Sequence, residues 1–196
     1  MKLDAQYRSS GSPVALEVDD AKNLHVVNTG GKYAEAALAG RLFYAANQTP
    51  VNTSTTLNTT FTGLGLCNPT GSGKIIIVHE FGWALDQAAA GDAVLALATT
   101  TDSGFAAAIV ARCTRNAYAT SVAYVDDGAT IIAPIIVKIL GSIGTNLTTD
   151  LTNPGFIDLG GSIVLDPGRS VVTDTTLATG ATSIQFSYMW EEIDED

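Results

Sequence analysis

The chain has 196 residues with a formal net charge of −10, and 46% of its residues are hydrophobic while only 15% are charged. The length allows one sizeable domain, or one domain with an extended arm, and the apolar content is enough for a core. The acidic balance gives no electrostatic attraction to a phosphate backbone, which argues against nucleic-acid binding. The low charged fraction, offset by Thr, Ser, Asn and Gly, is typical of β-rich proteins that associate through uncharged surfaces.

The sequence also argues against export and membrane insertion. The first ten residues hold no apolar stretch typical of a signal peptide, so we expect synthesis in the cytoplasm. The longest apolar run, 131–140, contains Pro134 and Lys138 and is too short to cross a bilayer. Cys67 and Cys113 lack metal-ligand spacing, so we expect buried free thiols, with a disulfide as the alternative.

Residues 1–40 differ from the rest of the chain. Two short alternating segments, Val14–Val18 and Leu24–Val27, flank the polar residues 19–23 and predict a small hairpin. Residues 33–38 predict one or two helical turns that Gly40 ends. This region has too few large apolar residues for a core of its own. We therefore predict an arm, residues 1–40, that lies on a neighbouring surface.

From Arg41 the sequence is typical of strands, which we predict at 41–46, 61–67 and 74–85. The Thr- and Asn-rich residues 47–60 predict a loop or an exposed edge strand. The turn-forming residues 68–73 predict a hairpin between the second and third strands. Alternation in the third strand, KIIIVHEFGWAL, places His79, Phe81 and Trp83 on one large-residue face, directed to the core or to a subunit junction.

Further strands are predicted at 93–101, 121–125, 130–141, 156–165, 170–178 and 184–190, while residues 104–113 fit a strand or a short helix. Asp126-Asp-Gly128 predicts a hairpin turn. The strand 130–141 has no polar face, so we expect a core on one side and a neighbouring subunit on the other. Pro134 within it indicates a bulge or an edge position.

The last strand has the clearest alternation, with Ile184, Phe186, Tyr188 and Trp190 on one face. Eight to ten strands separated by turns, without a βαβ rhythm, predict an all-β fold. We predict a jelly-roll-like antiparallel β-sandwich with an extended N-terminal arm, the sandwich covering residues 41–196. The acidic residues of the last six positions predict a solvated end, or a contact with a basic patch on a partner.

Candidate chemistry is sparse. The segment Gly71-Ser-Gly73-Lys74 fails as a phosphate loop, because that motif needs Gly at position 68 and Ser or Thr at position 75. His79 is read as a core or interface histidine, with a pH sensor at an oligomer axis as the alternative. The pairs Asp19-Asp20 and Asp126-Asp127 lie in predicted turns and lack a calcium-loop pattern. We predict no catalytic residue, metal or cofactor.

Several segments carry a resemblance to a known family. They are residues 41–50 (RLFYAANQTP), 62–74 (TGLGLCNPTGSGK), 165–168 (LDPG) and 186–192 (FSYMWEE). The chain resembles the capsid cement, or decoration, proteins of tailed phages, over most of residues 41–192. That resemblance implies a virion protein without enzymatic activity that forms a homotrimer on the capsid surface and ties major capsid subunits together.

The resemblance, together with the residue patterns, yields two sets of expected contacts. We expect the arm to contact the major capsid protein through these residues: Val14, Leu16, Val18, Leu24, Val26 and Tyr33. We expect the oligomer interface to include His79, Trp83, Ile135 and Ile136. The alternatives are a receptor- or glycan-binding module of a head fibre or tail, because jelly rolls often bind sugars, and a hydrolase on a β-scaffold.

Overall fold

The computed structural model describes residues 4–6, 13–15, 31–85, 93–102, 104–115, 118–143, 155–176 and 184–195. The chain divides into two compact units, Met1–Ala34 and Glu35–Asp196. In the first unit, strand β1 (Asp4–Gln6) pairs antiparallel with β2 (Pro13–Ala15). Val14 of the predicted Val14–Val18 strand thus pairs with Ala5, on its N-terminal side. Residues 24–27 lie outside the described residues.

The predicted helical turn before Gly40 is confirmed as α1 (Ala34–Leu38). Its hydrogen bond from Ala39 N–H to Glu35 O measures 2.9 Å. Gly40 follows with φ of +72°, a left-handed conformation that glycine adopts without strain and that commonly ends a helix.

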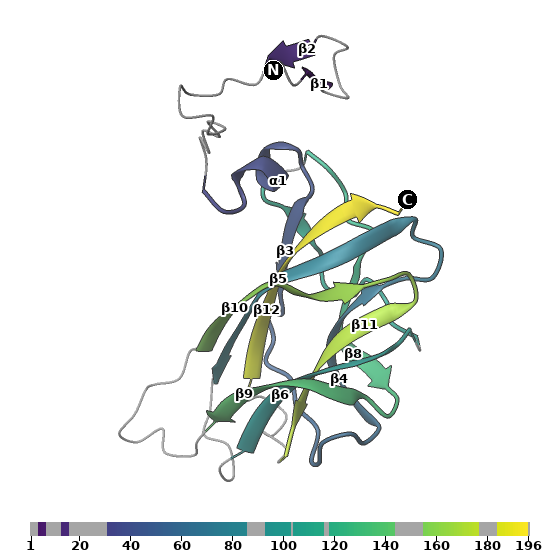
Figure 1. Ribbon diagram of the computed structural model, residues 1–196. Coiled ribbons are helices and arrows are strands. Elements are labelled where there is room, and N and C mark those ends of the chain that lie inside the picture. Colours follow the sequence, from purple (N-terminus) through teal and green to yellow (C-terminus); the bar gives the residue numbers. More distant parts are fainter. Residues whose placement is uncertain are drawn as a thin grey trace. The chain divides into compact units, whose positions relative to one another are not determined.

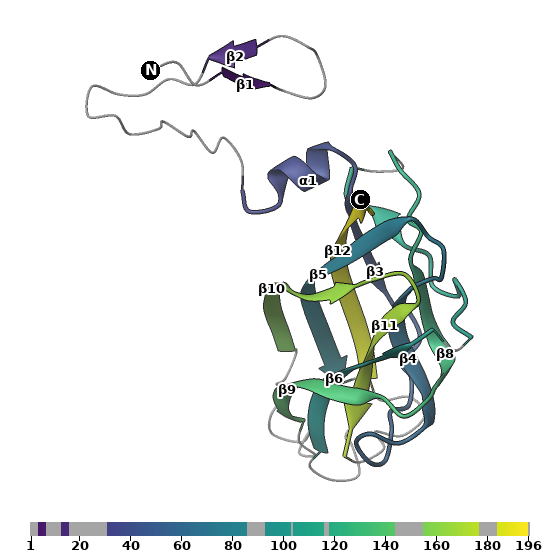
Figure 2. The same cartoon turned by 45° about the vertical axis from the view of Figure 1, so that its right-hand side comes forward.

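The second unit consists of two antiparallel five-stranded sheets packed as a sandwich, which confirms the predicted fold class. The first, called here the β12 sheet, contains β10 (Gly155–Leu165), β5 (Lys74–Leu85), β12 (Ile184–Asp194), β3 (Leu42–Ala46) and β7 (Arg112–Cys113), in that order. The second, the β11 sheet, contains β8 (Tyr124–Ile131), β4 (Phe61–Asn68), β11 (Arg169–Thr175), β6 (Ala93–Thr101) and β9 (Ile135–Ile143). Figures 1 and 2 show the two layers.

The strand order is that of a jelly roll. Strand β3 pairs with β12, β4 with β11, β5 with β10, and β6 with β9, so the chain forms nested antiparallel pairs rolled into two layers. Strands β7 and β8 belong to the connection between β6 and β9, and each extends one sheet at its edge.

The main core lies between the sheets and is rich in aromatic residues. Phe81 packs against Tyr188 and Phe186 with ring centroids 5.1 and 5.6 Å apart, and Phe43 stacks on Trp190 at 6.1 Å. The four alternating side chains predicted for the last strand are all buried here, so that prediction is confirmed. Aromatic side chains remove large apolar areas from water, which makes this layer the main source of stability.

A second apolar cluster covers the other face of the β11 sheet. Neighbouring residues divide between the two clusters, as Val171 belongs to the main core and Val172 to the second, because successive side chains of a strand point to opposite faces. Phe105, from the β6–β9 connection, closes the second cluster. A Cβ on Gly65 would lie 2.6 Å from Phe105, so this close approach requires glycine there.

The predicted face of β5 is wrong over its first half. Ile76 and Val78 are buried in the core, whereas His79 is an extra residue at a register shift, because Glu80 pairs with Met189 but Val78 pairs with Trp190. A β-bulge of this kind reverses which residues face the core on its two sides. In the second half of β5, Phe81 and Trp83 follow the predicted alternation.

Two predicted turns also differ from the structure. Asp126-Asp-Gly128 lies inside β8, where it forms a bulge opposite β4, and the Asp126 carboxylate accepts hydrogen bonds from the N–H groups of Gly128 and Ala106. Because these bonds satisfy the local backbone, the strand continues. It ends instead at residues 132–134, where Ala133 has φ of +40°, so the predicted strand 130–141 is divided between β8 and β9.

Residues 69–73 are a turn but not a hairpin turn, because β4 and β5 belong to different sheets. The Asn68 side chain fixes this crossing by donating to the carbonyls of Lys74 and Leu165, at 2.7 and 2.8 Å. β4 and β5 therefore each pair with a strand that is distant in sequence, β11 and β10 respectively. Periodicity reports which segments are strands but not which strands pair.

The acidic end is not a solvated tail up to Asp194, because β12 continues to that residue. Glu192 is buried and accepts hydrogen bonds from Ser121, from the Val122 N–H and from the Trp190 ring nitrogen. Across the described residues, no helix has the length and apolar character needed to cross a membrane.

Candidate interaction surfaces

Exposed large apolar side chains gather where β9 forms the edge of the β11 sheet. Ile135, Val137 and Ile139 of β9 are 70%, 49% and 56% exposed. Ile132, in the turn before β9, and Val164 of β10 are also more than half exposed, and with Ile135 they line a groove of about 400 Å³. These five residues are called the β9 patch. A partner that covers the patch would remove this apolar surface from water, which favours association.

The backbone edge of β9 is protected against further strand pairing. Its pairing with β6 shifts register twice, between Leu95 and Ala96 and between Leu97 and Ala98, and Lys138 lies between the shifts. Bulges and an edge lysine are devices that keep edge strands from pairing with other chains. The β9 patch therefore offers apolar side chains, not backbone hydrogen bonds.

His79 lies on the outer side of the β12 sheet, away from Phe81, which corrects the predicted face. Its side chain is 11% exposed, and its Nε2 lies 3.4 Å from Glu191 Oε2. The other oxygen of Glu191 accepts from Arg41 Nε at 2.9 Å. The Glu191 carboxylate thus lies between His79 and Arg41. His79 therefore serves as a local structural contact between β5 and β12.

The remaining residues of the predicted interface do not form one surface. Trp83 is partly buried against the main core, with its ring stacked on Phe81 at 5.7 Å. Ile136 packs on the second cluster, whereas Ile135 belongs to the exposed β9 patch. Of the four predicted residues, Ile135 is the one placed for contact with another molecule.

Most of the predicted arm contacts lie outside the described residues. Leu16, Val18, Leu24 and Val26 lie outside the described residues, and Val14 is placed as backbone in β2. Tyr33 precedes α1, and the Lys32 ammonium lies 5.0 Å from the centre of its ring. The capsid contacts assigned to this region stay a prediction.

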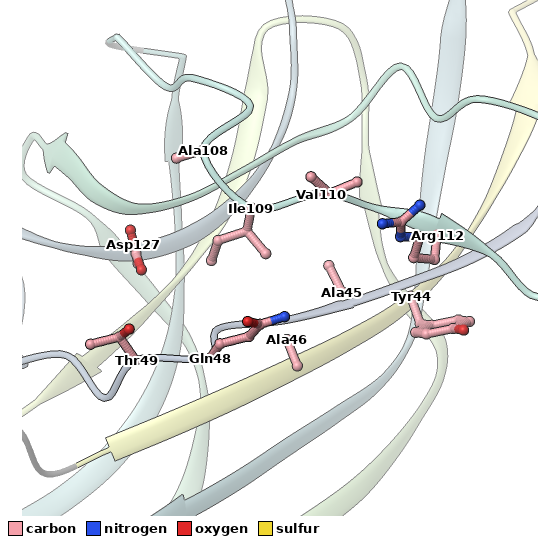
Figure 3. A pocket seen from close by; sticks show the side chains of 10 residues that line it. All are labelled: Tyr44, Ala45, Ala46, Gln48, Thr49, Ala108, Ile109, Val110, Arg112 and Asp127. Carbon is pink, nitrogen blue, oxygen red and sulfur yellow. The ribbon is translucent and has the colours of Figure 1, made fainter.

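A second opening lies at the other edge of the sandwich, beside β3. Its cavity of about 520 Å³ separates residues 44–49 from residues 108–112 and is called the β3 slot. Figure 3 shows Tyr44 and Arg112 at one end and Thr49 and Asp127 at the other. Between them the walls carry small and apolar side chains: Ala45, Ala46, Ala108, Ile109 and Val110.

The β3 slot forms because two paired segments separate. Strand β7 pairs with β3 only at Phe43–Cys113 and Tyr44–Arg112. Before Arg112, the chain instead pairs with β8, where the Ile109 N–H donates to Val125 O at 2.8 Å. The two walls therefore belong to the edges of different sheets.

Buried carboxylates in the body have structural partners. Asp174 accepts hydrogen bonds from the Ser54 hydroxyl and from the Asn58 N–H, which anchors the 47–60 loop against β11. The described residues contain no group of three or more His, Cys, Asp or Glu side chains arranged to hold a metal ion. The hydrogen bonds of Asp174 anchor a loop to the sheet.

Both cysteines are buried free thiols, as predicted. Burial, with a smaller contribution from Asp102, raises the pKa of Cys67 to about 12. Since the thiolate is the nucleophile and metal ligand, Cys67 is inert at neutral pH. It acts as a small apolar side chain of the second cluster.

No motif or periodic pattern in the sequence predicted the β3 slot. The Ala-rich residues 104–113 fitted either a strand or a helix, and the structure makes them an extended segment with a two-residue strand at its end. The one indication of an unusual segment was its small side chains, which favour neither a core strand nor a stable helix. Comparisons with family models, curated proteins and solved structures find no match to this chain.

Proposed function

We propose that this chain is a non-enzymatic structural protein of a tailed-phage virion, a cement protein that forms a homotrimer on the outer capsid surface. Its partners are other copies of itself and the major capsid protein. The resemblance of residues 41–192 to cement proteins supports this assignment, and a jelly-roll body is compatible with it, since viral capsid domains commonly have that fold.

The β9 patch is the observation that carries the proposal. Its side chains contribute little to folding, because they stay in water in the single chain. Three of the five side chains form a row on the edge strand β9, whose one charged residue is Lys138, and this suits an uncharged contact between subunits. In the proposed trimer this patch is the subunit interface.

The proposed mechanism is multivalent clamping. A trimer presents three arms, residues 1–40, to neighbouring capsid subunits, and each bound arm raises the effective concentration of the others. Weak individual contacts then sum to stable attachment. The shell resists tension between subunits without a change in the capsid protein itself.

The interface is tested by placing charge on the patch. The double variant Ile135→Asp/Ile139→Asp should sediment as a monomer where the native chain sediments as a trimer. The control, Thr55→Asp/Thr56→Asp, adds the same charge at two exposed loop positions and should stay trimeric. A native chain that is monomeric at all concentrations would contradict the proposed interface.

The capsid role is tested with phage particles and with an arm deletion. Mass spectrometry and electron microscopy of purified particles should locate the chain on the outer surface of the shell. Deletion of residues 1–40, the whole predicted arm, should give a folded trimer that no longer decorates shells. If the truncated trimer still decorates shells, clamping by the arm is wrong.

A glycan-binding module is the second candidate, favoured by exposed tyrosines. Tyr118 has Arg115 stacked over its ring at 4.1 Å, which occupies one face, while Tyr44 is exposed beside the β3 slot. Sugars commonly stack on such rings. A glycan array on which the native chain gives signals that Tyr44→Ala abolishes would favour this role over a capsid role.

A further inference from the structure

The β3 slot has unused backbone hydrogen-bonding groups on one wall. In β3, Asn47 N–H donates to Phe186 of β12, whereas Leu42 O accepts from Thr114 on the opposite side. In β3 the backbone N–H and C=O groups of odd-numbered residues therefore point toward β12, and those of even-numbered residues point toward the slot. Ala46 is the first even residue beyond the pairing with β7, and its N–H and C=O have no partner among the described residues.

The facing wall of the slot, residues 108–110, also has backbone hydrogen-bonding groups without described partners. Because Ile109 pairs with Val125 of β8, the backbone groups of Ala108 and Val110 point away from β8 and toward the slot. Within the described part of the chain neither residue has a backbone hydrogen bond on that side. Two strand edges thus face each other across a cavity with small apolar side chains.

We infer that the β3 slot accepts an extended segment of another polypeptide, which inserts as a strand between β3 and residues 108–110. An extended chain is the ligand whose own N–H and C=O groups alternate at the spacing that both walls present. The inserted strand joins the edge of the β12 sheet to the segment paired with β8. This inference does not depend on the proposed capsid role.

The charges of the slot define the chemistry of the partner segment. Arg112 lies at one end and Asp127 at the other, and neither side chain forms an ion pair within the described ranges. The matching segment has an acidic residue at the Arg112 end and a basic residue at the Asp127 end. Small or β-branched uncharged residues between them fit the alanine-rich walls.

The edges formed by β9 and β10 do not offer this site. The pairing of β9 with β6 shifts register twice, and that of β10 with β5 shifts between Asp158 and Ile163. The edge of β3 from Tyr44 to Gln48 is uncharged and its pairing with β12 has no register shift. Among these edges, β3 is the one without a device against strand addition.

The test measures binding of the peptide Ac-KTVTVTE-NH2 to the full chain by isothermal titration calorimetry. The peptide should bind saturably at one site per chain. The same peptide N-methylated at alternate residues keeps its side chains but loses donors on one edge, and should bind at least about 10-fold more weakly, the effect of losing one or two hydrogen bonds. Equal affinity of the two peptides, or no binding of either, overturns the inference.

Variants of the wall give a second, independent readout. Ala46→Pro removes the N–H that faces the slot and leaves the bonds to β12, so peptide affinity should fall at least about 10-fold. Ala46→Val keeps the N–H and should bind within about 3-fold of the native chain. If Ala46→Pro instead converts an oligomer to monomers, the occupant is a second copy and the assignment to a different polypeptide is wrong.

Discussion

Strands β12 and β9 are both rich in large apolar side chains, and the molecule uses them in opposite ways. In β12, Ile184, Phe186, Tyr188 and Trp190 are buried in the main core, whereas in β9 every second side chain from Ile135 to Ile139 is exposed. β12 lies between β5 and β3 and pairs with both, while among the described strands β9 pairs with β6 alone. Apolar content alone therefore does not report burial, and position in the sheet decides it.

The difference in burial between β12 and β9 distinguishes side chains that stabilise the fold from side chains that are free to contact another molecule. The buried apolar area of β12 stabilises the single chain, while the exposed area of β9 can contribute only when another molecule covers it. Substitutions along the two strands can break or sharpen this division, and their expected effects decrease in the following order.

The largest contrast is between Trp190→Ala and Ile139→Ala. Removing the fully buried Trp190 ring leaves a cavity beside Phe43 and should cost about 3–5 kcal/mol of unfolding free energy. Ile139 is mostly in water, so its truncation should change that free energy by about 0.5 kcal/mol or less. Urea denaturation at low protein concentration measures both, and similar losses would mean that β9 belongs to the folding core.

The polar end of β12 gives the second contrast. Glu192→Ala removes the acceptor for Ser121, Val122 and Trp190 and should cost about 2–4 kcal/mol, because buried donors are left unpaired. Glu191, the next residue, faces the other side of the sheet and pairs with Arg41 and His79.

Glu191→Ala is the matched control for that substitution. It should cost about 1 kcal/mol or less, since Arg41 is partly exposed and such pairs contribute little. Thermal unfolding of both variants gives the comparison. A larger loss for Glu191→Ala would place the structural anchor of β12 on the outer side of the sheet.

Tyr188→Phe should increase stability. The Tyr188 hydroxyl is buried in the main core without a hydrogen-bond partner in the described part of the protein, and burial raises the pKa of this group. Removing an unpaired buried hydroxyl should raise the unfolding free energy by about 1 kcal/mol. A destabilised Tyr188→Phe variant would show that the hydroxyl is bonded after all.

The sequence predicted strands better than it predicted faces and partners. The alternation of residues 184–190 survives because the extra residue at the register shift between Met189 and Trp190 belongs to β5 and not to β12. In β5 the extra residue His79 reverses the alternation, and no side-chain pattern announces a bulge that a distant strand imposes. The assignment of His79 to the core face was wrong for this reason.

The candidate sites show the same limit. Ile135 was identified from an apolar run, and it is exposed because β9 is at an edge, a property of sheet order and not of the run itself. The β3 slot was missed because it depends on Ile109 pairing with Val125 instead of continuing along β3. Such pairings between distant segments are not contained in local periodicity.

The smallest expected effect lies where β12 ends, at the pair of Asp194 and Lys74. The Lys74 ammonium, 2.5 Å from Asp194, lowers the pKa of that carboxyl below its ordinary value of 3.8. The pair therefore stabilises the fold above that value, and its contribution is lost as the pH falls through the lowered pKa. Because Asp194 is exposed, salt should weaken the effect. The melting temperatures of the native chain and Lys74→Met should differ slightly at neutral pH and converge once the pH lies below the lowered pKa, where the carboxyl is neutral in both. A difference that persists there would assign the role of Lys74 to packing of its methylene chain at the strand end and not to its charge.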